Sequence, residues 1–278
     1  TRPFHRVVID EAAQALEAAC WIALPHGARC VLAGDHRQLP PMIQSEEAAH
    51  GGLARTLFER LMESRDGERL GRMLTVQYRM HERIMAWPSA TLYGGKLQAA
   101  PSVRSHLLTD LPDVVANEWT SEALCFVDTA GCSHDESEGD DEGSKSNPGE
   151  AELVVRIVQA LRDAGVPAAA IAVITPYNAQ VQLLRSRLGG DEGLEIGTVD
   201  GLQGREKEAC VVSLVRSNEA GSVGFLAELR RLNVALTRAR RHLTVVGDSA
   251  TLAHDPDLCQ LVEHLQAHAT YRSAFELG

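Results

Sequence analysis

Short apolar runs alternate with amphipathic stretches along most of this chain. Val7–Ile9 is a run of β-branched residues, and in the following stretch, 11–23, apolar residues recur at helical spacing. A second apolar run, CVLAGD at 30–35, ends in glycine and aspartate. Strand, helix and strand over about thirty residues predict a βαβ unit with two parallel strands.

The same alternation resumes after residue 117 and continues toward the end of the chain. Strands are expected in the runs ALCFVDTAG, IAVITP, EIGTVDG, ACVVSLV and HLTVVGD. Helices are expected at 147–165, 178–188, 225–240 and 257–268. The helix at 147–165 has a full start signal, and it is expected to end at Gly165. Asn147 would be its N-cap, Pro148 its first residue and Glu150 the partner in a capping box.

These elements predict an α/β fold in which a mostly parallel sheet is covered by helices on both faces. Residues 1–92 contain two strands, too few for a complete sheet. Residues 93–278 contain at least five and are expected to form a whole domain. The first residue is Thr1 rather than Met, so we expect the chain to be part of a longer protein.

The composition is that of an ordinary folded protein, with 44% hydrophobic residues. No apolar run approaches the ~20 residues of a membrane span, and no leader peptide is visible, so no membrane partner is expected. The six cysteines form no Cys-x-x-Cys pair. They predict buried, reduced thiols in a cytoplasmic and/or nuclear protein rather than zinc ligands or disulfides.

The net charge of −11 argues against nucleic acid as a ligand, but the charge is unevenly distributed. An acidic, Ser/Gly-rich run lies near 133–147, where we expect a solvated, mobile loop. Its acidic residues are Asp135, Glu136, Glu138, Asp140, Asp141 and Glu142. Arginines cluster instead at 230–241. Net charge is therefore a poor guide to any single face.

Two acidic residues, Asp10 and Glu11, directly follow the first strand. One carboxylate can hold Mg²⁺ through water while the other takes a proton from an attacking water. The alternative is a helix N-terminus with favourable negative charge. GDHRQLPP at 34–41 follows the second strand, so its loop is expected beside Asp10. The Gln38 amide there can bond a phosphate or a water, or the motif is only a Pro-terminated turn.

Two further motifs carry residues that can contact a base, a phosphate or a ribose. In QYRMH, Tyr78 can stack on a base and Arg79 can reach a phosphate; the alternatives are core packing and a solvated arginine. TVDGLQGREKE contains a glycine-rich turn whose N–H groups can face an anion, with Glu206 able to accept from a ribose hydroxyl. A plain glycine turn is the alternative.

The motif LNVALTRARR ends a predicted helix with several arginines. Arg238 can offset the charge on a phosphate being transferred, or it can simply complement the helix dipole. In order, IDEAAQALEA, GDHRQLPP, QYRMH, TVDGLQGREKE and LNVALTRAR resemble motifs II to VI of superfamily 1 RNA/DNA helicases. The resemblance covers nearly the whole chain. Within this superfamily, the chain resembles the branch that contains the nonsense-mediated-decay helicase and the immunoglobulin-mu-binding-protein helicase. Three segments, TAGCS, the acidic run and NPGEAE, are most similar to the second of these helicases.

The resemblance implies RecA-like (P-loop NTPase) domains with ATP bound between them. Residues 1–92 would be the C-terminal part of the first domain, and 93–278 the complete second one. On the matched positions, Asp10 would hold Mg²⁺, Glu11 would activate the hydrolytic water, and Gln38 would sense the γ-phosphate.

The same resemblance implies roles for residues of the later motifs. Tyr78 would stack on adenine, and Arg79 and Arg238 would act as arginine fingers. Gly204 and Glu206 would contact the phosphates and the ribose. The backbone of single-stranded RNA or DNA would be contacted by Thr175, Asn178 and Thr198. Members of this branch move 5′ to 3′, and we expect the chain to be monomeric.

One expected motif is missing, because the sequence contains no G-x-x-x-x-G-K-[ST] phosphate loop. In the family this loop precedes the acidic pair, so we expect it upstream of Thr1, in the other half of the motor domain. The isolated chain is then expected to hydrolyse ATP negligibly. A non-catalytic nucleic-acid- or protein-binding module with a helicase fold stays open as an alternative. A helicase fused to a nuclease is a weaker alternative, since no additional carboxylate cluster supports it.

Overall fold

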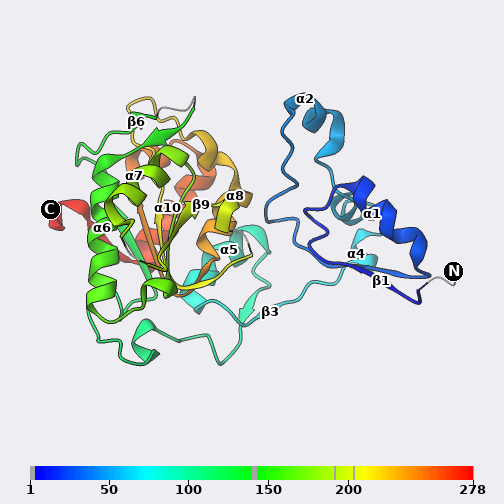
Figure 1. Cartoon of the computed structure of the whole chain (residues 1–278), viewed down its shortest axis with the longest axis horizontal. Helices are drawn as coiled ribbons and strands as arrows, with labels where there is room; N and C mark the ends of the chain where they lie inside the picture. The colour runs from blue at the N-terminus through cyan, green and yellow to red at the C-terminus, as the bar shows by residue number, and fades with distance from the viewer. Residues whose placement is uncertain (1–3, 140–142, 191, 203, 278) are drawn as a thin grey trace. The chain divides into compact units, whose positions relative to one another are not determined.

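The computed structural model describes residues 4–139, 143–190, 192–202 and 204–277 (Figure 1). The chain forms two compact units, Thr1–Leu74 (unit 1) and Thr75–Gly278 (unit 2). The sequence placed the division later, after residue 92. Helix α5 (Glu82–Leu92) lies within unit 2 because it contacts strand β11 (Ala239–Gly247) and other elements of that unit. None of the helices in the described part of the chain is long and apolar enough to cross a bilayer.

Unit 1 is built around two short strands. β1 (Val7–Ile9) and β2 (Cys30–Leu32) pair in parallel, which confirms the predicted βαβ unit. The connecting helix α1 begins at Glu17 and ends at Ala23, later than the expected start at Glu11. Glu11 has a φ of 50°, a left-handed conformation that an α-helix excludes, and residues 10–14 form turns instead.

Short helical segments complete unit 1. They are η1 (Leu24–His26), α2 (Glu46–Ala48), η2 (Ala49–Leu53), α3 (Leu57–Met62) and α4 (Gly67–Leu70). Helix α3 begins with a capping box, in which the Thr56 hydroxyl accepts from Glu59 N at 3.1 Å and the Glu59 carboxylate accepts from Thr56 N at 3.3 Å. Val8 on β1 and Val31 on β2 remain 66% and 49% exposed, so the two-stranded sheet is incompletely covered within unit 1.

Unit 2 contains a six-stranded sheet in the order β12-β5-β11-β10-β8-β9, and every neighbouring pair is parallel. The strands are β5 (Leu124–Asp128), β8 (Ile171–Thr175), β9 (Glu195–Thr198), β10 (Lys207–Ser213), β11 and β12 (Thr270–Ser273). The predicted α/β fold with a parallel sheet is thereby confirmed. Strand β12 was not expected, because its sequence TYRS is polar and short.

Helices cover both faces of this sheet (Figure 1). α6 (Pro148–Asp163) and α7 (Asn178–Leu188) pack against each other on one face. α5, α8 (Leu229–Leu236) and α10 (Pro256–His268) lie on the other. The buried core between α6, α7 and the sheet includes Val154, Ile157, Leu161, Val173 and Val211. Right-handed crossovers explain why the helices lie on both faces of the sheet. A connection that runs along the sheet in one direction places its helix on one face, and a connection in the opposite direction places its helix on the other.

Shorter elements connect these layers. The strand pairs are β3 (Val76–Gln77) with β4 (Gln98–Ala99), in parallel, and β6 (Ser137–Glu138) with β7 (Lys145–Ser146), antiparallel. The helical turns are η3 (Leu108–Asp110), η4 (Ala168–Ala170), η5 (Asp200–Leu202), η6 (Gly224–Ala227), α9 (Ser249–Leu252) and η7 (Ala274–Glu276).

The start of α6 differs in one respect from the prediction. Asn147 is the N-cap, and its side chain accepts from Glu150 N at 2.9 Å. The predicted capping box is wrong, however, because Asn147 N donates to Gln180 Oε1 at 2.9 Å. The Glu150 carboxylate turns into the sheet and accepts from Ser213 Oγ at 2.6 Å and Val215 N at 2.9 Å. Tertiary partners therefore outcompete the local capping interaction.

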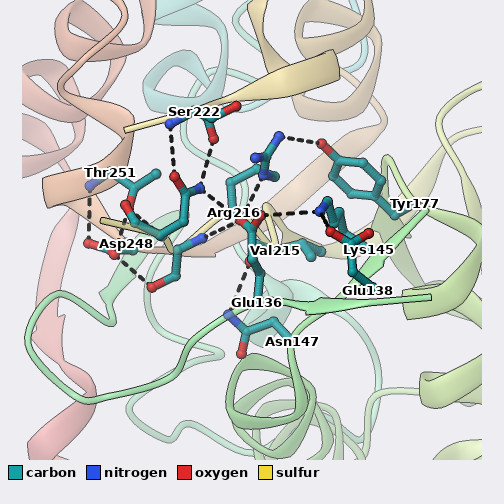
Figure 2. A network of polar contacts seen from close by, with 12 residues as sticks. Glu136, Glu138, Lys145, Asn147, Tyr177, Val215, Arg216, Ser222, Asp248 and Thr251 are labelled. Atoms are coloured by element: carbon teal, nitrogen blue, oxygen red, sulfur yellow. Dashed lines mark hydrogen bonds and ion pairs between the residues drawn. The ribbon is translucent and has the colours of Figure 1, made fainter. Parts of the chain in front are cut away.

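The described part of the acidic run differs from the expectation of a solvated, mobile loop. Its strands β6 and β7 pair, and Glu136 Oε2 accepts from Arg216 Nε at 2.7 Å, Ser217 N at 3.0 Å and Asn218 Nδ2 at 2.9 Å (Figure 2). The expectation was wrong for Glu136 because an arginine after β10 pairs with it. Asp140, Asp141 and Glu142 lie outside the described residues.

All six cysteines are free thiols. Cys20, Cys125 and Cys210 are buried as expected, and burial raises the pKa of Cys125 and of Cys210 to about 12. Cys30 is exposed, because it begins a strand of the incompletely covered sheet in unit 1.

Candidate functional site

The acidic pair in unit 1 lies in the turn that follows β1. Both side chains are exposed, and Asp10 Oδ1 accepts from Glu11 N at 3.0 Å. The loop after β2 passes close by, because a Cβ on Gly34 would lie 2.8 Å from Ala13 N. Glycine at this position thus allows the GDHRQLPP loop to approach the turn that carries the two carboxylates.

Gln38 is held by an aspartate of its own loop. Its Nε2 donates to Asp35 Oδ2 at 2.9 Å, and Arg37 N donates to Asp35 Oδ1 at 2.9 Å. The amide of Gln38 is half-buried. The predicted phosphate sensor therefore has a fixed orientation in unit 1.

The exposed carboxylates suit a magnesium ion of the kind that accompanies nucleotides. Mg²⁺ usually retains several waters and binds one or two carboxylates together with phosphate oxygens. No group of three or more His, Cys, Asp or Glu side chains that could hold a metal occurs among the described residues. A Mg²⁺ at Asp10 would consequently depend on water and phosphate for its other ligands.

A second cluster of predicted site residues forms within unit 2. The Tyr78 side chain is 71% exposed. Arg79 Nε lies 2.5 Å from Glu206 Oε2, and Arg79 Nη1 donates to Thr237 O at 3.3 Å. Gln77 fixes this turn, since its Oε1 accepts from Arg79 N at 2.8 Å. Residues of QYRMH and TVDGLQGREKE are thus brought into direct contact.

Arg238 joins the same cluster from the end of α8. It is buried, and its Nε donates to Val234 O at 3.0 Å and its Nη1 to Arg205 O at 3.2 Å. Its Nη2 donates to Thr237 Oγ1 at 3.4 Å. Both predicted arginine fingers therefore contact Thr237, Arg79 at its carbonyl and Arg238 at its hydroxyl.

Glu206 links two arginines at this cluster. Besides Arg79, it accepts from Arg240 Nη1 at 2.7 Å. Partial burial favours the neutral acid, but the hydrogen bond from Arg79 and the charges of Arg79 and Arg240 outweigh it, so the pKa of Glu206 is lowered. The carboxylate is therefore ionised at neutral pH and holds Arg79 electrostatically.

The glycine-rich turn before Glu206 is open to solvent. Gly204 has a φ of 75°, and a Cβ built on it would meet no atom within 4 Å. The Thr198 hydroxyl accepts from Gly201 N at 3.4 Å and so stabilises the start of the turn. Gln203 lies outside the described residues.

The three predicted nucleic-acid contacts lie at the carboxyl ends of β8 and β9. Thr175 and Thr198 are register partners on these strands, and Asn178 is the exposed first residue of α7. Thr175 is fully buried, and among the described residues its Oγ1 has no hydrogen-bond partner. Direct contact with a nucleic-acid backbone is thus open to Asn178 and Thr198 but not to Thr175 in this conformation.

Sequence reasoning did not single out Arg216, which pairs with Glu136 just after β10 (Figure 2). Its guanidinium is buried, with Tyr177 Oη 3.3 Å from Nη1. The available signal was an arginine placed directly after an apolar strand, in the run ACVVSLVR. An arginine there is rarely buried without a carboxylate partner.

Comparison with known proteins identifies relatives over nearly the whole chain. AAA domain families match residues 53–250 and 1–46. The chain is 56% identical over 274 residues to "DNA-binding protein SMUBP-2" of Mesocricetus auratus, covering 98% of this chain and 28% of that protein. It is 48% identical over 256 residues to "DNA polymerase alpha-associated DNA helicase A" of Schizosaccharomyces pombe, covering 90% and 38%. It is 36% identical over 273 residues to "Regulator of nonsense transcripts 1" of Dictyostelium discoideum, covering 95% and 20%. The chain thus spans at most 38% of the length of these three relatives.

Proposed function

The chain belongs to the superfamily 1 helicases and contains their AAA domain, and we propose that it forms the C-terminal motor portion of an ATP-dependent RNA/DNA helicase. In this proposal, ATP hydrolysis drives 5′-to-3′ translocation along single-stranded nucleic acid. The observation that carries it is a cluster in which Arg79 and Arg238 both contact Thr237 and Glu206 pairs with Arg79. These residues come from three separate motifs, and the positive charges of Arg79 and Arg238 suit a polyphosphate.

The acidic pair of unit 1 would serve the hydrolytic water. We propose that Asp10 is the ligand for Mg²⁺ and that Glu11 takes the proton of the attacking water. Gln38, held by Asp35, would orient the water or the γ-phosphate. A bound Mg²⁺ would neutralise charge on the β- and γ-phosphate oxygens.

The cluster in unit 2 would bind a nucleotide. The exposed ring of Tyr78 suits stacking on adenine. A phosphate would compete with Glu206 for Arg79 and with Arg205 O for Arg238, so both arginines would exchange an internal partner for the nucleotide. Once released, the Glu206 carboxylate could accept from a ribose hydroxyl, and the open turn at Gly204 would face the phosphates.

Single-stranded RNA or DNA would cross the carboxyl ends of β8 and β9. Asn178 begins α7, where the helix dipole favours a phosphate, and Thr198 lies at the end of the next strand. Thr175, whose hydroxyl is buried, would not touch the nucleic acid directly but would support the end of β8 from inside the fold. Because backbone contacts carry no base information, this arrangement suits translocation without strict sequence preference.

We also propose that further strands of the same motor domain complete the sheet of unit 1. Parallel sheets are normally covered on both faces and extend beyond two strands, yet Val8 and Val31 are largely exposed. The relatives are much longer than this chain, which leaves room for such strands.

The decisive experiment is Glu11→Gln in the intact protein. We expect nucleic-acid-stimulated ATP turnover to fall by about 10²-fold or more, because the general base is lost, while ATP binding changes little. Turnover is measured by phosphate release and binding by a fluorescent nucleotide. Glu63→Gln, in the same unit and also exposed, is the matched control.

Unchanged turnover in the Glu11→Gln protein would contradict the proposal that the protein is an ATP-hydrolysing enzyme. It would favour the alternative, a non-catalytic binding module. The intact protein is required because these 278 residues contain no phosphate loop. The chain alone is expected to show negligible turnover.

A further inference from the structure

A topological switch point lies between β8 and β10. From β8 the chain continues through α7 to β9, on one side, and from β10 it continues through α8 to β11, on the other. The connections that leave the carboxyl ends of these adjacent strands therefore run in opposite directions. Open α/β sheets bind ligands at such points, in the crevice between the diverging loops.

An exposed aromatic ring stands at this crevice. Phe225, in the loop after β10, is 51% exposed. The Arg231 guanidinium lies 6.0 Å from the centroid of the Phe225 ring, and the Tyr177 ring lies 5.7 Å from it on the side of β8. Arg231 also pairs with Glu228 at 3.1 Å and Asp200 at 3.6 Å, which fix it beside the ring.

Behind the ring lies a narrow apolar hollow. Its walls include Ile174, Thr175, Pro176, Leu214 and Leu232, together with Phe225 and Arg231. The buried Thr175 hydroxyl, which has no hydrogen-bond partner among the described residues, belongs to this wall. The hollow has room for about one water molecule, so a larger flat group would lie across its mouth, on Phe225.

Arg216 fixes the two loops that meet here (Figure 2). Its Nη1 lies 3.3 Å from Tyr177 Oη, and its Nε lies 2.7 Å from Glu136 Oε2. Gly224, next to Phe225, leaves space for this guanidinium, since a Cβ there would lie 2.1 Å from Arg216 Nη1. Arg216 thus supports Tyr177 and the residue before Phe225 at the same time.

The backbone beneath Arg216 is strained. Val215 has a φ of 72°, which is unusual for a β-branched residue, and Arg216 N donates to Leu214 O at 2.8 Å, closing a three-residue turn. Glu150 accepts from Val215 N at 2.9 Å, and Asn147 Nδ2 donates to Val215 O at 3.0 Å. Strain that is held by buried partners on both sides is typical of functional sites.

From these features we propose that Phe225 is a stacking platform for a base of single-stranded nucleic acid, and that Arg216 is a positioning residue for it. The inference rests on the proposed function and adds a base contact to the backbone contacts proposed for Asn178 and Thr198. Stacking on an aromatic ring accepts any base, and the neighbouring arginine adds cation–π attraction. The site therefore fits a motor that moves along any sequence.

The test compares Phe225→Ala with the unchanged intact protein. The probes are a fluorescein-labelled oligodeoxythymidylate of about 15 nucleotides and an abasic deoxyribose-phosphate strand of the same length. Binding is followed by fluorescence anisotropy across several salt concentrations. We expect Phe225→Ala to weaken oligothymidylate binding by roughly 5- to 100-fold, to leave abasic binding unchanged, and to keep the salt slope, because no phosphate contact is lost.

Further variants separate stacking from folding. Phe225→Tyr should bind like the unchanged protein, and Phe225→Leu, which keeps apolar volume, should resemble Phe225→Ala. Phe275→Ala removes another exposed aromatic ring of unit 2, away from the crevice, and should have no effect. Arg216→Met should weaken oligothymidylate binding more than abasic binding, whereas a merely structural role would weaken both equally.

Two results would overturn this inference and leave the proposed function standing. One is an equal loss of binding to both probes by Phe225→Ala, and the other is oligothymidylate binding by Phe225→Ala equal to that of the unchanged protein. Failure of the unchanged protein to bind either probe would overturn the proposed function as well.

Discussion

At the scale of single residues, Glu150 illustrates how burial changes a side chain. It is fully buried at the start of α6, and desolvation raises the pKa of its carboxyl group to about 8, although hydrogen bonds from Ser213 and Val215 N act in the opposite direction. A neutral acid at pH 7 is consistent with its second oxygen, Oε1, which has no partner in the described part of the structure.

This shift predicts a pH dependence of stability. The reference pKa of Glu150 is 4.5, and the folded value is about 8, so between these values the unfolded chain releases a proton that the folded chain keeps. The stabilising contribution of Glu150 to the free energy of unfolding is fully present below pH 4.5 and is lost as the pH rises through about 8. We expect Glu150→Gln to remove this slope, a difference on the order of a few kcal/mol between pH 5 and pH 8.

The measurement is urea unfolding of the chain at several pH values. Glu152→Gln on the same helix is the control, since Glu152 is exposed and should leave the slope intact. An unaltered slope in Glu150→Gln would show that the carboxyl group is ionised when buried.

At the scale of elements, the loop after β10 is specified by contacts on several sides. Gly224 has a φ of 54° and lies against the Arg216 guanidinium and Tyr177 Oη. Any side chain there would displace the arginine as well as strain the backbone. The loop geometry therefore depends on a glycine whose importance a turn pattern alone does not reveal.

We predict that Gly224→Ala destabilises unit 2 by about 3 kcal/mol or more, while Gly94→Ala costs only about 1–2 kcal/mol. Gly94 is a matched control, because its φ is 59° and a Cβ there would meet no atom within 4 Å. Thermal unfolding of the two variants gives the comparison. Equal losses would mean that the Arg216 contact contributes nothing beyond backbone strain.

At the scale of the whole molecule, the two units differ in how well their sheets are covered. In unit 2, β10 and β11 lie in the interior of a six-stranded sheet and are almost entirely buried. In unit 1, β1 and β2 form a two-stranded sheet of half-buried and exposed residues. Less apolar burial gives less protection against local opening.

Hydrogen exchange of the chain should therefore show two levels of protection. We expect amides of β1 and β2 to exchange at least ~10-fold faster than those of β10 and β11, because two strands alone are marginally stable. Mass spectrometry of peptides from the two units measures the difference. Similar protection in both units would refute the view that the unit 1 sheet needs further strands.

The sequence was sufficient for most of the parallel strands, for helices α6, α7 and α10 and for the assignment to a helicase family. These features depend on local periodicity and short motifs, so β1, β8 and β10 and the start of α6 at Pro148 were predictable. The nucleotide and nucleic-acid roles of the motif residues stay predictions.

Only the tertiary structure decided which polar groups meet. The pairing of Arg79 with Glu206, the burial of Glu150 against Ser213 and the support of Tyr177 by Arg216 join residues far apart in the chain. A local pattern carries no information about such partners, and so it favoured a capping box for Glu150 and a solvated Glu136. In the fold, buried polar groups must find partners wherever the packing provides them, and that requirement outweighs local preference.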